Sequence, residues 1–110
     1  MKTLNLKLDT TGVDLGKDDT RTPQEVAMAM IENIVITYAN QQKPVGLAEN
    51  DRRVFYKIAD VFEVARQTKA ETVELDEDWL GFIRKCFRTN LMPNTLLQRL
   101  EKELEKASNS

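Results

Sequence analysis

The segment Val54-Phe-Tyr-Lys-Ile-Ala-Asp-Val-Phe-Glu-Val-Ala65 is the most apolar helical stretch of the chain and lies at its centre. Its apolar residues recur at the three- and four-residue spacing of one helix face: Val54, Ile58, Val61 and Ala65. Phe55 and Phe62 lie one position further on and widen this face. A helix with such an apolar face gains its stability from packing, so we expect the other helices to surround it.

The composition is that of an ordinary globular protein, with 110 residues, 41% apolar and 31% charged. This length suits one domain with a single core. The net charge of −2 provides no overall attraction to nucleic acid or to an anionic membrane. No apolar run approaches the ~18 residues of a membrane span, and the N-terminal residues lack the apolar core of a signal peptide. These features predict a cytoplasmic protein.

The N-terminal residues have the alternating pattern of a half-buried strand. Leu4, Leu6 and Leu8 fall on one side of an extended chain. A turn over 9–12 and a return strand containing Val13 and Leu15 would make a hairpin within 1–16. Thr72–Leu75 is the only other extended-looking segment, and we expect it to pair with residues 3–8.

Four helices are predicted, and their ranges are 22–42, 48–69, 76–89 and 94–107. Thr22 can cap the first helix, with Pro23 and Glu25 at favoured positions after it. Asp76 is the expected N-cap of the third helix. The expected fold is mainly α: one compact four-helix domain over 1–107, with an N-terminal β-strand or hairpin packed against it and a frayed tail at 108–110.

Candidate catalytic and metal groups are few. Histidine is absent, which removes the commonest general base and the commonest zinc ligand. Cys86, the single cysteine, has basic neighbours that would activate a thiol, but it shares the apolar stripe of Trp79 and Ile83. A buried cysteine is therefore predicted, and no internal disulfide is possible. We expect no catalytic residue and no enzyme activity.

Two acidic groups lack the spacing of a calcium-binding loop. Their residues are Glu74, Asp76, Glu77 and Asp78, and Asp9, Asp14, Asp18 and Asp19. Helix capping and solvated turns account for them, so we expect no metal and no cofactor.

The basic residues fall in two clusters, and these are Arg52, Arg53 and Lys57, and Arg84, Lys85 and Arg88. Brought together by adjacent helices, they would make a phosphate-contacting patch, with Tyr56 and Trp79 as stacking surfaces. Carboxylates lie between them and no nucleic-acid motif is present. Tyrosine and arginine also dominate protein–protein hot spots. The predicted partner-binding residues are Arg52, Arg53, Tyr56, Arg84, Lys85 and Arg88.

The order of segments resembles that of small accessory proteins of tailed bacteriophages and prophages. After the leucine-alternating strand and a capped helix come three segments in turn. These are Arg52-Arg-Val-Phe-Tyr-Lys-Ile-Ala-Asp60, Val73-Glu-Leu-Asp-Glu-Asp-Trp-Leu80 and Leu91-Met-Pro-Asn-Thr-Leu-Leu-Gln-Arg-Leu-Glu101. The resemblance is one of layout and spacing and carries over no functional residue. It implies a phage protein, located in the cytoplasm of a bacterial host or in the virion.

The leading functional prediction is a non-enzymatic protein-binding module, a bacteriophage accessory protein acting on a host or phage protein. One alternative is a virion structural or assembly component that self-associates through its charged last helix or a leucine edge near Leu4–Leu8. A second alternative is a nucleic-acid-binding protein that uses the two basic clusters. A membrane partner is not expected.

Overall fold

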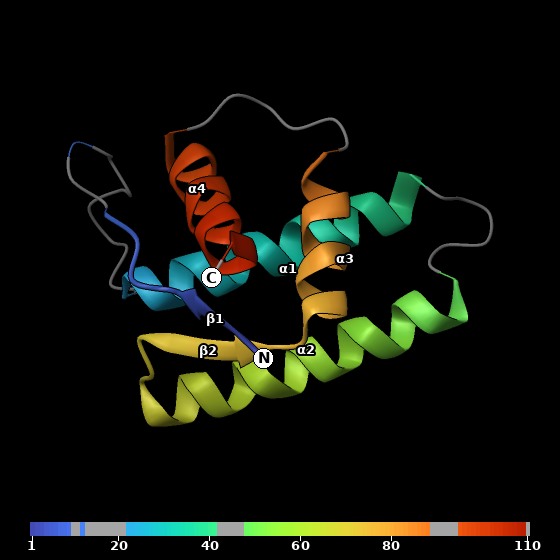
Figure 1. Ribbon diagram of the computed structural model, residues 1–110, viewed down its shortest axis with the longest axis horizontal. Coiled ribbons are helices and arrows are strands. Elements are labelled where there is room, and N and C mark those ends of the chain that lie inside the picture. Colours follow the sequence, from blue (N-terminus) through green and yellow to red (C-terminus); the bar gives the residue numbers. More distant parts are fainter. Residues whose placement is uncertain (10–11, 13–21, 42–47, 89–94, 110) are drawn as a thin grey trace.

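In a computed structural model of the protein, residues 1–9, 12, 22–41, 48–88 and 95–109 are described, and four helices and a two-stranded sheet account for most of them (Figure 1). The elements in chain order are β1 (Lys2–Asn5), α1 (Pro23–Gln41), α2 (Glu49–Thr68), β2 (Thr72–Leu75), α3 (Glu77–Phe87) and α4 (Thr95–Asn109). The predicted mainly α fold, with four helices and an N-terminal strand, is confirmed.

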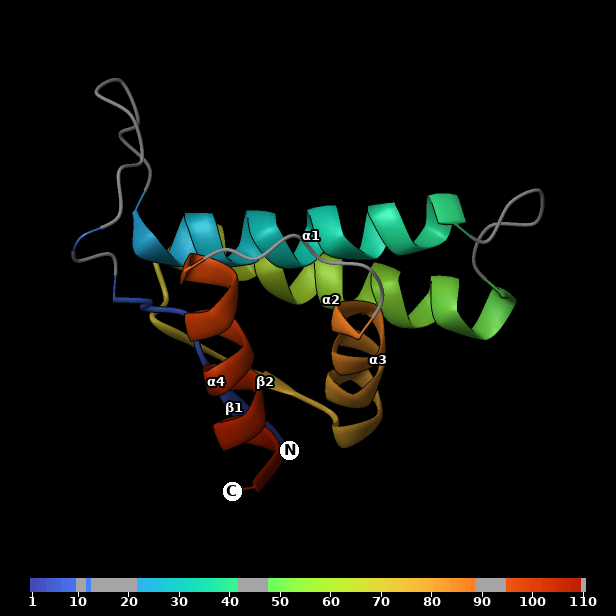
Figure 2. The same cartoon turned by 90° about the horizontal axis from the view of Figure 1, so that it is seen from above.

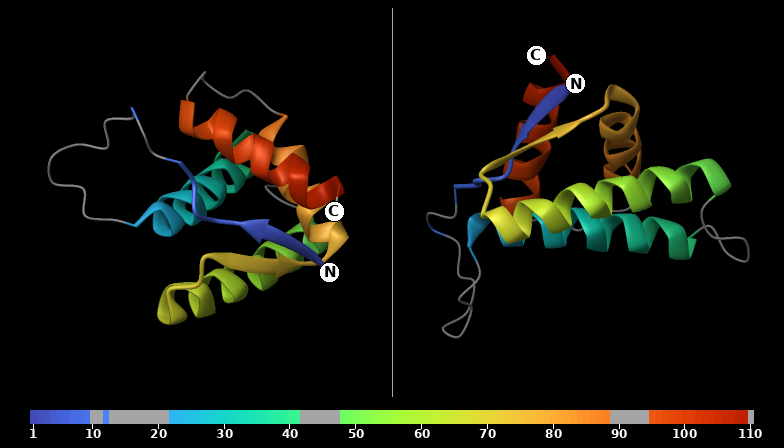
Figure 3. Two further views of the ribbon diagram at one scale, coloured as in Figure 1. Left: turned by 60° about the vertical axis from the view of Figure 1, so that its left-hand side comes forward. Right: turned by 90° about the horizontal axis from the view of Figure 1, so that it is seen from below.

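The longest helices, α1 and α2, lie side by side and form one layer of the molecule. Figure 2 shows α3, α4 and the sheet together on one side of this pair. β1 runs between β2 and α4, and β2 runs between β1 and α2 (Figure 3). The central helix predicted from the sequence therefore packs against α1, α3 and β2.

The sheet joins the first residues of the chain to a segment far along it. β1 and β2 are antiparallel, with Lys2 opposite Leu75 and Leu4 opposite Val73. This confirms Thr72–Leu75 as the partner segment, although the paired strand covers residues 2–5 and not the expected 3–8. β1 ends at Asn5, but Leu6 still donates its backbone N–H to the Glu71 carbonyl oxygen at 2.8 Å. The expected return strand at Val13 and Leu15 lies outside the described residues.

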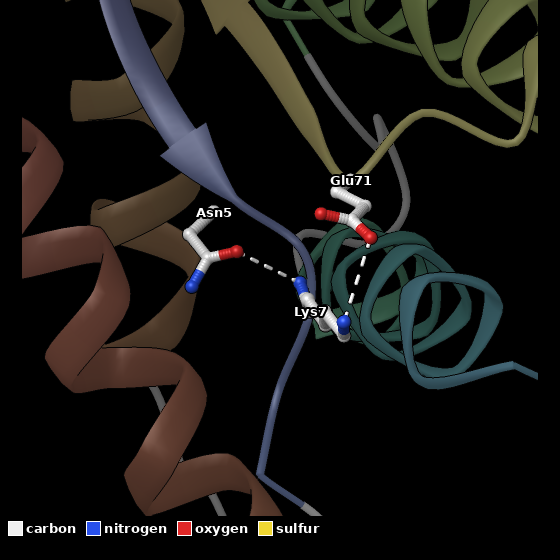
Figure 4. Close-up of polar contacts among 3 residues, drawn as sticks. All are labelled: Asn5, Lys7 and Glu71. Atoms are coloured by element: carbon white, nitrogen blue, oxygen red, sulfur yellow. Dashed lines mark hydrogen bonds and ion pairs between the residues drawn. The ribbon is translucent and has the colours of Figure 1, made fainter.

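The three N-terminal leucines are buried against the helices, as their alternation predicted. Beside them, Lys7 donates its backbone N–H to Asn5 Oδ1 at 3.0 Å, and its ammonium group lies 3.5 Å from a Glu71 carboxylate oxygen (Figure 4). Because Leu4, Leu6 and Leu8 face the core, they form no exposed leucine edge for self-association.

The helix ends follow local sequence signals in part. The Thr22 hydroxyl accepts a hydrogen bond from the Glu25 backbone N–H at 3.2 Å, as expected for a cap. Asp76 occupies the N-cap position of α3, but its side chain makes no capping hydrogen bond, contrary to expectation. α2 ends at Thr68, and the left-handed backbone of the next residue, Lys69 (φ 54°), is a common helix stop. α4 continues to Asn109, two residues beyond its predicted end.

The core lies where all four helices and the sheet meet. On α2 the fully buried residues are Ile58, Phe62 and Ala65, whereas Val54 and Val61 are only half-buried. The inward face of α2 is thus turned slightly toward Phe62 relative to the stripe expected from periodicity. Within the described part of the chain, no helix is both long and apolar enough to cross a membrane.

Candidate functional site

Lys85, a basic residue of α3, links this helix to α2 through an ion pair. Lys85 Nζ on α3 lies 3.4 Å from Asp51 Oδ2 on α2 and 5.4 Å from the ring centroid of Tyr38 on α1. Hydrogen bonding to Tyr38 and the negative charge of Asp51 raise the pKa of Lys85 above its ordinary value, although partial burial opposes them. Lys85 is therefore a structural link between three helices.

On its other flank α3 faces α4 across a cleft of about 270 Å³, which we call the α3–α4 cleft. Two arginines at the C-terminal end of α3, the second of them its C-cap, line it opposite two glutamates of α4, and the remaining lining is apolar. The lining residues are Arg84, Arg88, Glu101, Glu105, Phe87 and Leu104. Among the described residues, none of these four charges comes within ion-pair distance of another.

The second basic cluster is therefore divided between two environments. Lys85 faces α2, whereas Arg84 and Arg88 share a cleft with Glu101 and Glu105. Carboxylates lie beside Arg53, beside Lys85 and beside the two cleft arginines, and they offset part of the local positive potential that a phosphate-binding patch requires. This arrangement argues against a nucleic-acid interface built from both clusters.

The first half of α2 carries the remaining predicted partner-binding residues on its outer side. Arg52, Arg53 and Lys57 are exposed, and Tyr56 among them is 61% exposed. Arg53 donates to a carboxylate oxygen of Glu49 at 2.7 Å, one helical turn earlier. We call Arg52, Arg53, Tyr56 and Lys57 the Tyr56 surface.

Cys86 lies in the core, as predicted, with 0% of its surface exposed. Burial raises the pKa of its thiol to about 11, although the positive charge of Lys85 acts in the opposite direction. The group is therefore a protonated, inaccessible thiol near neutral pH. In the described ranges, no group of three acidic or cysteine side chains is arranged to hold a metal ion.

A groove between α2 and β2 was not predicted from the sequence. It has a volume of about 440 Å³, and we call it the edge groove. Apolar side chains line most of it, with a carboxylate on each wall. Its apolar lining includes Val61, Val64 and Val73, and its two carboxylates are those of Asp60 and Glu74. The sequence feature that could have indicated this groove is Val64, an aliphatic residue on the polar side of α2. Its side chain is 58% exposed in the structure.

Comparison of the chain with family models, with curated proteins and with solved structures gives no match. The function of the chain is therefore inferred from its own geometry and from the layout of its sequence.

Proposed function

We propose that this chain is a non-enzymatic protein-binding module and that the Tyr56 surface contacts its partner. The observation that carries the proposal is the exposure of Tyr56 on a part of α2 where Arg52, Arg53 and Lys57 are exposed as well. Tyrosine and arginine dominate binding hot spots, because each offers a large contact area together with hydrogen-bonding groups.

The exposure of Tyr56 is unusual for this molecule. The large apolar side chains left exposed in the described ranges are Met1, Ile36, Tyr56 and Val64. Tyr56 is the aromatic one among them, although it neighbours Phe55, with 6.4 Å between the ring centroids. Phe55 turns toward the core while Tyr56 does not, so α2 presents an aromatic ring to solvent that a partner would bury.

The charge around Tyr56 indicates the kind of partner. Arg52 and Lys57 make no ion pair with another described residue, so they are available to carboxylates of a second protein. An acidic protein surface would gain both steering and orientation from them. The phage-like layout of the sequence supports a bacteriophage accessory protein that binds such a surface on a host or phage protein.

The test is affinity capture from bacterial lysate with matched variants. The native chain should recover a specific protein, and Tyr56→Ala should lose it with unchanged helical content by circular dichroism. Ile36→Ala is the control, because it removes an exposed apolar side chain from α1 instead. Equal recovery by the native chain and Tyr56→Ala would remove this surface from consideration.

Solution mass separates this function from self-association. Light scattering over a concentration series should give a monomer at every concentration. A defined multimer that dissociates in Tyr56→Ala would instead assign the surface to contacts between subunits, as expected of a virion structural or assembly component.

A further inference from the structure

The outer edge of β2 presents backbone hydrogen-bonding groups to the edge groove. Leu6 and Glu71 form a hydrogen-bonded pair, since the Leu6 N–H bonds to the Glu71 carbonyl oxygen. Bonded and non-bonded pairs alternate along an antiparallel ladder. Val73, two residues beyond Glu71, therefore bonds to β1, whereas the N–H and C=O groups of Thr72 and Glu74 point away from β1.

No described strand pairs with this outer edge. The sheet of the described residues has two strands, so β2 is an edge strand on the side toward α2. Thr72, Val73 and Glu74 line the groove together with the second half of α2. An edge strand beside an apolar groove is a template for a further strand, which is a common way to bind an extended peptide.

The side chains of the groove define the pattern that an added strand would need. Residues directly opposite one another in a sheet point to the same face. A residue opposite Val73 would thus enter the apolar part of the groove, near Val61 and Val64. A residue opposite Glu74 would lie beside its exposed carboxylate.

The negative charge of the groove favours a basic peptide over a second copy of this chain. Asp60 and Glu74 are both acidic, and no basic residue is among the described residues that line the groove. A second copy of this chain would bring the same two carboxylates into the contact, where like charges repel. A segment with basic side chains would neutralise them.

We propose that the β2 edge binds an extended segment of another polypeptide as a third strand, with apolar residues alternating with basic ones. Its apolar side chains lie against Val61 and Val64, and its basic side chains pair with Asp60 and Glu74. This site is separate from the Tyr56 surface, so either can be disproved without the other.

The probe is a capped peptide of alternating sequence, Lys-Val-Lys-Val-Lys-Val-Lys, titrated into the ¹⁵N-labelled protein and followed by NMR. The amide signals of Thr72 and Glu74 should shift in a saturable way, and their hydrogen exchange should slow at least tenfold. A peptide with glutamate in place of lysine should not bind, and neither should one that is N-methylated at alternate residues. Equal binding of the glutamate peptide would overturn the proposal.

Matched variants place the peptide on the molecule. Asp60→Lys and Val64→Asn should each weaken peptide binding about tenfold, the equivalent of one lost charge or apolar contact. Glu63→Lys is the control, because it makes a comparable charge change on the exposed side of α2 outside the groove lining. Tyr56→Ala should also leave the Kd unchanged. Binding that is lost in Tyr56→Ala and retained in Asp60→Lys would overturn the proposal.

Self-association provides the last test. The protein alone should remain monomeric at NMR concentration, with fast exchange at Thr72 and Glu74. If these amides were protected without peptide and the mass doubled, the edge would belong to a second copy and the proposal would fail.

Discussion

The two flanks of α3 carry similar charges but are built differently. Toward α2, Lys85 lies 3.4 Å from Asp51 and over the ring of Tyr38, so the two helices are joined by a direct contact. Toward α4, Arg84 and Arg88 face two glutamates across a cleft without an ion pair among them. We refer to these as the closed flank and the open flank.

The difference shows that charge composition does not determine whether a helix contact forms. Lys85 packs its charge against an aromatic ring, where cation–π attraction adds to the ion pair. The charges of the open flank lie on an open surface, where water competes with each ion pair and the net gain is small. The closed flank should therefore contribute to folding stability, whereas the open flank leaves its charges available to solvent or a ligand.

The largest effect is expected from Ile83, which is fully buried on α3. Ile83→Ala should lower the free energy of unfolding by about 3 kcal/mol, because it leaves a cavity in the core behind both flanks. Urea unfolding followed by circular dichroism measures this. Gly81→Ala is the control on the same helix: a Cβ there meets no atom within 4 Å, so it should stabilise by about 0.5–1 kcal/mol. A loss below about 1 kcal/mol for Ile83→Ala would contradict the packing described.

The pH dependence of the free energy of unfolding tests whether the buried thiol of Cys86, on α3, is shielded from water. Burial raises the pKa of Cys86 from 9.0 to about 11, so the native state retains a proton that the unfolded state has lost. Stability should therefore fall as pH rises from 9 to 11, by up to about 2–3 kcal/mol from this thiol. The raised pKa of Lys85 acts in the same direction, because the stability that it contributes below the ordinary lysine pKa is lost as pH rises above that value.

Cys86→Ala serves as the control for the pH effect, since it removes the thiol while Lys85 remains. Urea unfolding of both proteins at several pH values should show the additional loss in the native chain alone. Parallel pH curves would mean that water reaches Cys86 in the folded state.

A double-mutant cycle tests the closed flank directly. Asp51→Ala and Lys85→Ala should each destabilise the protein, with a coupling energy of about 1 kcal/mol between them, because one ion pair is lost in either variant. Denaturant unfolding of the two single variants and the double variant gives this value. If the two destabilisations simply add, the contact between Asp51 and Lys85 makes no net contribution to stability.

The smallest effect is expected on the open flank. Arg84→Ala and Glu105→Ala should change stability additively, with coupling below about 0.5 kcal/mol, because no ion pair joins them in this structure. The same unfolding measurements apply. A coupling as large as that of Asp51 and Lys85 would mean that the cleft closes in solution and would remove the contrast between the flanks.

Features governed by local sequence were predictable. The Thr22 cap depends on neighbouring residues, and the burial of Leu4, Leu6 and Leu8 follows from the period of a strand. The pairing with Thr72–Leu75 was predictable because only one other segment had an extended pattern. Periodicity assigns a residue to a face, but it does not say which element lies opposite that face.

The candidate sites were harder to predict for this reason. Arg84 and Lys85 are adjacent in sequence, yet about 100° of helical rotation directs them to different neighbours. The edge groove depends on the offset between α2 and β2, which only tertiary packing determines. The sequence shows Val64 as an apolar residue on the polar side of α2. That it lines a groove could be recognised only from the position of Val73 in the structure. The roles of Tyr56 and its basic neighbours remain predictions.

The pairing of β1 with β2 has a consequence for how the chain folds. The paired residues are about seventy positions apart, so β1 is synthesised long before its partner strand exists. Until then Leu4, Leu6 and Leu8 have no sheet to join, and closing so long a loop costs entropy before any contact repays it. The helical layer of α1 and α2 can assemble from nearer contacts. We therefore expect β1 to join the sheet late in folding. Until it does, the three leucines are exposed and must avoid non-native apolar contacts.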